Sequence, residues 1–322
     1  MLLRKIVSTL AGTALLVCAA TAVAQDGKTL RLILPFPPGG GTDALARVIA
    51  PKLSRELGTN VIVENRPGAS GQIAVSFVKS APPDGSIVLF TSDHSLVVVP
   101  HLNPKAGYEV LRDFVALGQV SRFQLALALS PGTAARSLGD FASYVKSNPD
   151  KAMFGLPVIG GFPSTVGVAV AKKFGVPMQA IPFVGSAPMM QNMAGDQIPA
   201  GISGLPDFLP LQIAGRLRVV AVSGRRRAAA LPDVPTFEEL GYSGLAVNSW
   251  YAFFGPKELP RSFTEKFNQA LGRTLGDPEV KQRLSELAQE LAPTSLEEAA
   301  AEMKLAADFW AEAAKSPDFV RP

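Results

Sequence analysis

The sequence predicts an α/β fold with two lobes, and two observations lead to this prediction. Short apolar segments alternate with amphipathic segments between Leu30 and Thr91, at spacings typical of parallel strands joined by crossover helices. The same plan returns between Phe123 and Val222, although no close sequence repeat links the two stretches. Two α/β lobes of similar design are therefore expected.

The predicted elements of the first half start with a buried strand and a helix. The segments are strand Leu30–Pro35, helix Asp43–Leu57, strand Asn60–Glu64, helix Gln72–Ser80 and strand Ser86–Thr91. Thr42 or Asp43 is expected to cap the first helix at its N-terminus, since short polar side chains accept hydrogen bonds there. Gly58 is expected to end this helix in the left-handed conformation.

The second half begins with the same alternation and ends in helices. The segments are strand Phe123–Ser130, helix Leu138–Asn148, strand Ala152–Gly155, helix Gly161–Phe174, strand Ala180–Phe183, a helix through Met193, strands Ile198–Ile202 and Leu217–Val222, the aromatic strand Ser249–Pro256, and helices 262–275, 278–291 and 296–315. Thr236 with Glu239, and Ser295 with Glu298, match the capping box of a helix start. Met303, Ala307 and Trp310 are expected to form a packing stripe, and Arg225–Arg227 a solvated loop.

The first 24 residues have the pattern of a secretory signal peptide. Arg4 and Lys5 precede the apolar run Ile6–Ala20, and Ala22-Val23-Ala24 provides small residues for cleavage before Gln25. No second apolar span follows, so an exported, periplasmic protein is expected.

Charge and cysteine content exclude several classes. Removing 24 of 322 residues leaves 298, and losing Arg4 and Lys5 lowers the net charge from +4 to +2. Such a balanced chain is not expected to bind nucleic acid. The single cysteine, Cys18, lies in the predicted signal peptide, so disulfides, thiol catalysis and thiolate metal sites are not expected.

The loop Pro35–Asp43, "PFPPGGGTD", joins a strand to a helix and is the strongest candidate for a binding site. Backbone N–H groups at a helix start favour an anion, such as a dinucleotide phosphate or a small carboxylate. Gly39–Ala44 matches Gly-x-Gly-x-x-Ala, and Glu64 ends the next strand as a ribose-binding acid would. Pro37-Pro38 and the predicted export argue against this dinucleotide interpretation.

Catalytic motifs are absent from the sequence. It has no His-Glu-x-x-His, no Gly-x-Ser-x-Gly and no Walker lysine. The two histidines, His94 and His101, are expected to be loop or surface residues. An enzyme that uses carboxylates stays open, because acidic pairs have no distinctive spacing.

Four segments resemble a known family. They are "LILPFPPGGGTDALARVIAPKLSRELGTNVIVENRPGASGQIA", "IPFVGSAP", "AGRLRVVAVSGRRRAAALPDVPTFEELGY" and "WYAFFGP". Together they resemble the extracytoplasmic solute receptors of tripartite tricarboxylate transporters, the Bug or TctC-like family. This resemblance implies a type II periplasmic-binding-protein fold with a ligand cleft between two lobes. Residues 25–121 plus 251–322 would form the first lobe, and residues 122–250 the second.

The resemblance also implies a function. The protein would capture a small organic carboxylate (a di- or tricarboxylate, an amino acid or an aromatic acid) and deliver it to inner-membrane transporter subunits. It would act as a monomer, without cofactor, metal or catalysis. Two alternatives stay open: a receptor for a signalling system and a secreted α/β enzyme.

The binding residues that the resemblance implies come from both lobes. The first lobe would supply Pro35, Phe36, Gly39, Gly40, Thr42 and Asp43, and the second Gly160, Gly161, Phe162, Ser164, Gly185, Ser186 and Ala187. Three polar residues follow the third strand: Ser92, Asp93 and His94. They would be either further ligand contacts or simply polar turn residues. Many relatives have a histidine where Ser164 stands and an aspartate near Ser203, so this chain departs from the pattern. Asp43 would order water or a loop, and Gly39-Gly40 would approach Gly185-Ser186 on closure.

Overall fold

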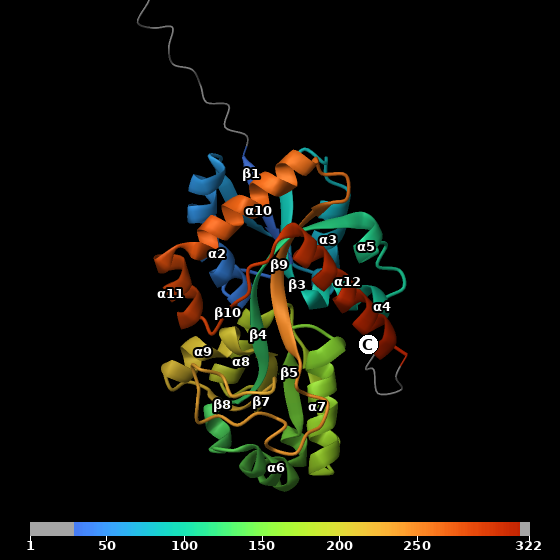
Figure 1. Ribbon diagram of the computed structural model, residues 1–322. Coiled ribbons are helices and arrows are strands. Elements are labelled where there is room, and N and C mark those ends of the chain that lie inside the picture. The colour runs from blue at the N-terminus through green and yellow to red at the C-terminus, as the bar shows by residue number, and fades with distance from the viewer. Residues whose placement is uncertain (1–28, 316–322) are drawn as a thin grey trace, which may run out of the picture.

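A computed structural model describes residues 29–315, and the predicted signal peptide lies outside this range. The described chain forms two lobes around one curled sheet of ten strands (Figure 1). The strand order is β2-β1-β3-β9-β4-β7-β5-β6, and β8 and β10 also pair with β4. The predicted two-lobed α/β class is therefore confirmed.

The first lobe contains the parallel strands that the sequence predicts. They are β1 (Leu30–Leu34), β2 (Val61–Asn65) and β3 (Ile87–Ser92), with β1 between the other two. The helices of this lobe are α2 (Gly41–Leu57), α3 (Gln72–Lys79), α4 (Val99–Leu102), α5 (Val110–Asp113), α10 (Arg261–Gly276), α11 (Pro278–Glu286) and α12 (Leu296–Ala313). Leu45, Ile49 and Leu53 of α2 are fully buried, because their spacing puts them on one face of the helix.

The second lobe repeats the arrangement with shorter strands. Its strands are β5 (Met153–Leu156), β6 (Gln179–Pro182), β7 (Ala200–Gly204) and β8 (Arg218–Val222), and its helices are α6 (Leu138–Ser147), α7 (Gly161–Phe174), α8 (Ser186–Ala194) and α9 (Leu205–Ile213). Strand β5 runs parallel to β6 and β7, whereas β7 and β8 run antiparallel to β4. Met189, Met193 and Phe208 fill a core between α8, α9 and this part of the sheet.

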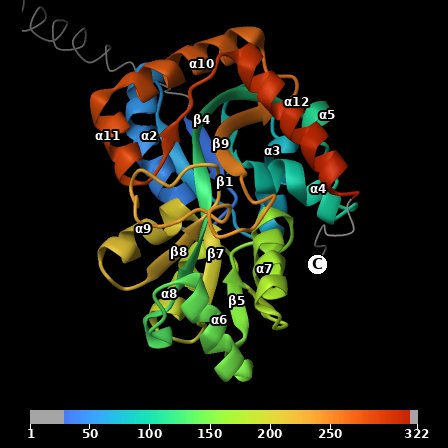
Figure 2. The ribbon, with the colours of Figure 1, turned by 60° about the horizontal axis from the view of Figure 1, so that its bottom comes forward.

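Two long antiparallel strands, β4 (Phe114–Leu129) and β9 (Asn248–Pro256), connect the lobes (Figure 2). Their pairing runs from Phe114 opposite Pro256 to Gln124 opposite Asn248. The predicted strand Phe123–Ser130 covers only the second half of β4, which begins at Phe114. In the first half of the strand the Ser121 hydroxyl donates to the side chain of Gln289 (2.6 Å), and the backbone N–H of Gln119 donates to Thr294 Oγ1 (2.9 Å).

Three predicted helix boundaries are wrong. Helix α2 begins at Gly41 with Gly40 as its N-cap and no side-chain cap, so neither Thr42 nor Asp43 caps it. Helix α11 ends at Glu286, and the chain then forms β10 (Glu290–Leu291) against β4. Thr236 and Glu239 make both capping-box hydrogen bonds but open only a turn, not a helix.

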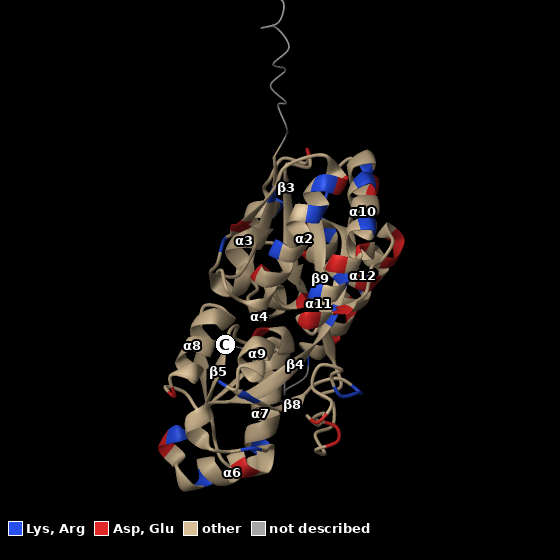
Figure 3. Ribbon diagram, turned by 90° about the vertical axis from the view of Figure 1, so that its left-hand side faces the viewer, with Lys and Arg blue, Asp and Glu red and all other residues tan. Residues whose placement is uncertain are grey.

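Figure 3 marks charged residues along the outer helices, α10 among them. Arg225–Arg227 are exposed, as predicted. Between residues 29 and 315, no helix has the length and apolar character needed to cross a bilayer. No cluster of three or more His, Cys, Asp or Glu suited to a metal ion occurs in this part of the chain.

Candidate ligand-binding site between the lobes

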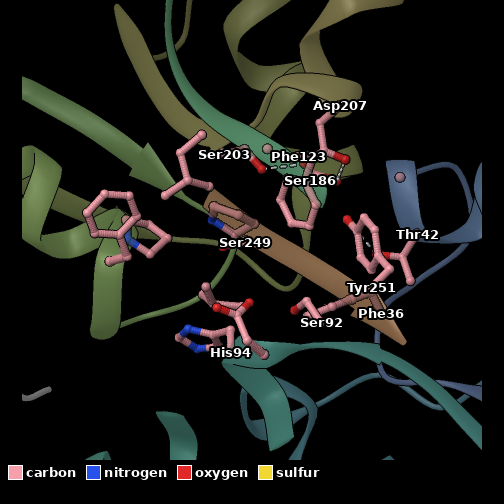
Figure 4. Close-up of a pocket in the computed structure, with 18 of the residues that line it drawn as sticks. Phe36, Thr42, Ser92, His94, Phe123, Ser186, Ser203, Asp207, Ser249 and Tyr251 are labelled. Carbon is pink, nitrogen blue, oxygen red and sulfur yellow. Dashed lines mark hydrogen bonds between the residues drawn. The ribbon is translucent and has the colours of Figure 1, made fainter. Parts of the chain in front are cut away.

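A cavity of about 70 Å³ lies where the two lobes meet the crossing strands. Such a volume holds several water molecules or a small part of an organic ligand. The lining comes from the loop before α2, the segment after β3, the starts of α7, α8 and α9, and both long strands (Figure 4). The lining residues are Phe36, Gly40, Thr42, Ser92, Asp93, His94, Val98, Phe123, Leu125, Pro157, Val158, Phe162, Pro163, Ser186, Ser203, Gly204, Asp207, Ser249, Tyr251 and Trp310.

The two lobes touch at the glycine-rich loop. A β-carbon built on Gly40 would lie 2.6 Å from Ser186 Oγ, and one on Gly185 would lie 2.6 Å from Pro37 Cδ. Gly39-Gly40 and Gly185-Ser186 therefore approach each other, as the sequence predicts. Gly40 has φ −89°, which any residue can adopt, so its backbone conformation does not require glycine. The absence of a side chain matters because of the contact with Ser186.

The backbone N–H groups at the start of α2 bind a carboxyl group of the protein itself. Asp207, in the first turn of α9, accepts the Gly41 N–H at 2.6 Å and the Ser186 hydroxyl at 2.8 Å on Oδ1. The Ser203 hydroxyl donates to Oδ2. These bonds connect the second lobe to the positive end of the α2 dipole. Asp207 is partly exposed, but its carboxyl group is buried. This burial raises the pKa of Asp207, and it outweighs the three hydrogen bonds, which lower the pKa.

Asp43 holds the loop and does not line the cavity. Its carboxylate accepts the Gly39 N–H at 3.1 Å, Arg47 Nε at 2.9 Å and Asn65 Nδ2 at 3.1 Å. Burial would raise the pKa of Asp43, but these three donors together hold it below its ordinary value. Asn65 also donates to the Phe36 carbonyl at 3.0 Å. Asp43 and Asn65 thus fix the loop in which Phe36 and Gly40 face the cavity.

His94 lies at the opposite side of the cavity from Asp207 (Figure 4), and Asp93 precedes it, where β3 leads into the π-helical turn His94–Val98. Both residues are buried, at 5% and 8% exposure. Asp93 Oδ1 and both ring nitrogens of His94 have no hydrogen-bond partner among the described residues. Burial raises the pKa of Asp93 to about 7, and it lowers the pKa of His94 to about 4. His94 is therefore not a surface residue; it lines the cavity, as the alternative interpretation of the sequence suggested.

Aromatic rings form much of the wall. Phe123 of β4 stacks on Tyr251 of β9 with ring centroids 4.4 Å apart. The Thr42 hydroxyl donates to the Tyr251 hydroxyl at 3.2 Å, which ties the start of α2 to the crossing strand. Phe162 and Trp310 complete the wall from α7 and α12. Trp310 thus belongs to the predicted packing stripe and also reaches the cavity.

The structure brings together some of the residues that the sequence suggested. Those that line the cavity are Phe36, Gly40, Thr42, Ser92, Asp93, His94, Phe162 and Ser186. Those that lie beside it without lining it are Pro35, Gly39, Asp43, Gly160, Gly161, Ser164, Gly185 and Ala187. Several of these shape the loops: the Ser164 hydroxyl, for example, accepts the Gly160 N–H at 2.8 Å at the start of α7.

Sequence reasoning missed the lining residues on the long strands and on α9. Ser249 and Tyr251 belong to a strand that looks like core, so their polar atoms gave no signal. The segment "GISGLPD" was expected to lack the carboxylate near Ser203, but Asp207 places one within hydrogen-bonding distance of Ser203. The sequence did contain one signal for Asp207: a polar residue in the first turn of a helix that follows a strand ending in glycine.

The comparisons identify the class and then the family. The solved structure of the periplasmic binding protein BugD is 28% identical, with a TM-score of 0.84 over 91% of this chain and 99% of that one. R. palustris Rpa4515 with adipate is 28% identical, with a TM-score of 0.85 over 91% and 98%. MatC from Rhodopseudomonas palustris with bound malate is 25% identical, with a TM-score of 0.82 over 89% and 99%. The fold is thus that of periplasmic binding proteins.

The family assignment follows from the sequence comparisons. Residues 45–315 match the model of the tripartite tricarboxylate transporter family receptor, TctC. Protein BugT of Bordetella pertussis is 31% identical over 82% of this chain and 81% of its own length. The chain belongs to this family of solute-binding receptors, as the resemblance of its motifs implied.

Proposed function

We propose that this protein captures a small organic carboxylate in the periplasm and delivers it to the inner-membrane subunits of a tripartite tricarboxylate transporter. The family supports this role, and solved relatives hold malate and adipate. In the proposal, the mature chain begins at Gln25 and acts as a monomer. The lobes comprise residues 25–121 plus 251–322 and residues 122–250, so the division crosses both long strands where Ser121 pairs with Tyr251.

The observation that supports the proposal most strongly is the position of the cavity between two lobes, which the long strands β4 and β9 connect. A ligand enclosed there contacts both lobes at once, so its binding free energy favours the closed arrangement. Small carboxylates are held in such sites by N–H and hydroxyl donors. The Tyr251 hydroxyl accepts a hydrogen bond from Thr42 and can donate its own proton to a ligand, and Ser92 adds a second hydroxyl to the lining; the hydroxyls of Thr42 and Ser203 donate within the protein.

The proposed contacts follow from this geometry. Phe36, Gly40, Thr42, Ser92, Asp93, Phe162 and Ser186 contact the ligand, together with Ser203, Ser249 and Tyr251. Pro35, Gly39, Asp43, Gly160, Gly161, Ser164, Gly185 and Ala187 position these contacts from the second layer. The Gly41 N–H already donates its hydrogen bond to Asp207. In the proposal, the ligand carboxylate therefore binds at hydroxyl groups of the cavity lining and not at this N–H.

Lobe closure is the experiment that tests this function. The predicted mature chain has no cysteine, so Ser80→Cys and Ser143→Cys accept spin labels, one per lobe, at exposed positions. A panel of organic acids is first screened by thermal shift. The acid that stabilises the protein most should then shorten the distance between the labels, because ligand and closure are coupled.

A pair of labels within one lobe, Ser143→Cys and Lys172→Cys, is the control and should show no change. Saturable binding with an unchanged distance between Ser80 and Ser143 would contradict capture by closure.

A further inference from the structure

One end of the cavity is chemically incomplete. Asp93 Oδ1, His94 Nδ1 and His94 Nε2 are buried and have no partner among residues 29–315. A buried polar atom without a hydrogen bond costs free energy, and native proteins rarely leave three such atoms together. All three belong to residues that line the cavity. A group of the ligand is therefore the natural partner for this end.

The charge of the lining restricts what that group can be. Two carboxyl groups, Asp93 and Asp207, line the cavity, and none of the described lining residues is a lysine or an arginine. His94 adds no positive charge near neutral pH, because burial lowers its pKa to about 4. A dianionic ligand would thus enter a poorly solvated space beside two acids without any cation to compensate it.

The two carboxyl groups differ in how many of their oxygen atoms have a hydrogen-bond donor within the protein. Asp207 is satisfied from within the protein, by the Gly41 N–H and the hydroxyls of Ser186 and Ser203. Asp93 has the Ser249 hydroxyl and backbone N–H groups as donors, but Oδ1 is left without one. Asp93 is consequently the acid that can take a hydrogen-bond donor from a ligand.

The walls between the two ends suit a cation and an apolar body. The rings of Phe36, Phe123, Phe162, Tyr251 and Trp310 line the cavity. Aromatic ring faces attract ammonium groups and cover hydrocarbon, whereas they offer nothing to a second carboxylate.

We propose that the ligand bears one carboxylate and one protonated amine, and that Asp93, with His94 beside it, accepts the ammonium group. The inference rests on the proposed function and restricts the class of ligand that the receptor binds. The ligand class is that of amino acids and related zwitterions, in contrast to the malate and adipate bound by the relatives.

Matched pairs of acids test the proposal by calorimetry on the mature protein. Each pair replaces one carboxylate by an ammonium group: β-alanine against succinate, and δ-aminovalerate against adipate. An aromatic set compares phenylalanine with phenylpropionate and benzylsuccinate. The amino member that binds best should bind at least tenfold more tightly than its dicarboxylate partner.

Asp93→Asn locates the effect. This isosteric change should remove the preference, with a loss of at least tenfold for the amino compound and no loss for the dicarboxylate. Asp150→Asn, at an exposed position outside the cavity, is the matched control and should leave both affinities unchanged. Far-UV circular dichroism checks that both variants are folded.

The outcomes separate the two levels of the proposal. Tighter binding of a dicarboxylate, or a preference that survives Asp93→Asn, overturns the ammonium assignment and leaves the carboxylate receptor in place. Binding of none of these acids by the wild-type protein overturns both.

Discussion

Gly40→Val should weaken ligand binding by about 10- to 100-fold, the equivalent of about 1–3 kcal/mol of overpacking. The β-carbon alone would lie 2.6 Å from Ser186 Oγ, and Asp207 holds that hydroxyl in place at 2.8 Å. The lobes must therefore separate to admit the side chain, and the closed cavity is lost. Calorimetry with the acid identified by thermal shift measures the effect.

Gly272→Val is the matched control for this prediction. Gly272 lies in α10, and a β-carbon built there meets no atom within 4 Å. The control should bind as the wild type does, and both variants should keep the far-UV spectrum of the wild type. Unchanged affinity of Gly40→Val would show that the contact between Gly40 and Ser186 plays no part in binding.

Asp93→Asn should make the ligand-free protein more stable at pH 8, by up to about 4 kcal/mol. Burial raises the pKa of Asp93 from 3.8 to about 7 in the folded protein. Above pH 7 the carboxyl group is ionised in both states, and the folded state bears the full cost of that buried charge. Below about pH 4 it is protonated in both states, so the cost disappears.

The difference between Asp93→Asn and wild type should therefore grow as the pH rises from 4 to 7. Denaturant unfolding at pH 4, 6 and 8 measures it. Asp150→Asn, at an exposed position, should stay within about 0.5 kcal/mol of wild type throughout. If Asp93→Asn were no more stable than wild type at pH 8, burial of the Asp93 charge would not destabilise the protein, contrary to our inference.

His94 works in the opposite direction in the wild-type protein. Its folded-state pKa is lowered to about 4, so its contribution to stability is lost as the pH falls below 6.5. Comparison of Asp93→Asn with wild type removes most of this contribution, because both proteins contain His94.

The local elements of the fold were predictable from the sequence, whereas half of the cavity was not. Helix α2 follows from its apolar spacing, and Gly58 ends it with φ 66° as expected. Phe36 and Gly40 were suggested because the glycine-rich loop is visible in the sequence. Asp207 was not suggested, because its partner Gly41 lies 166 residues away.

The long strands explain the other missed residues. Phe123 and Tyr251 are buried, at 6% and 5% exposure, so their pattern matches that of core positions. Only the curl of the sheet decides that these positions face a cavity between lobes. The predicted start of β4 was wrong for a related reason, since the buried hydroxyl of Ser121 is satisfied by Gln289, from a segment far along the chain.

Mass spectrometry of the small molecules released on denaturation tests the central claim most directly. The mature protein is purified from the periplasm without added ligand, in parallel with Gly40→Val. We expect a small organic acid to be released from the wild type in near-stoichiometric amount and to be depleted from the variant. Release of no acid from the wild type, or of the same acid in equal amount from both proteins, would contradict capture in the cavity between the lobes.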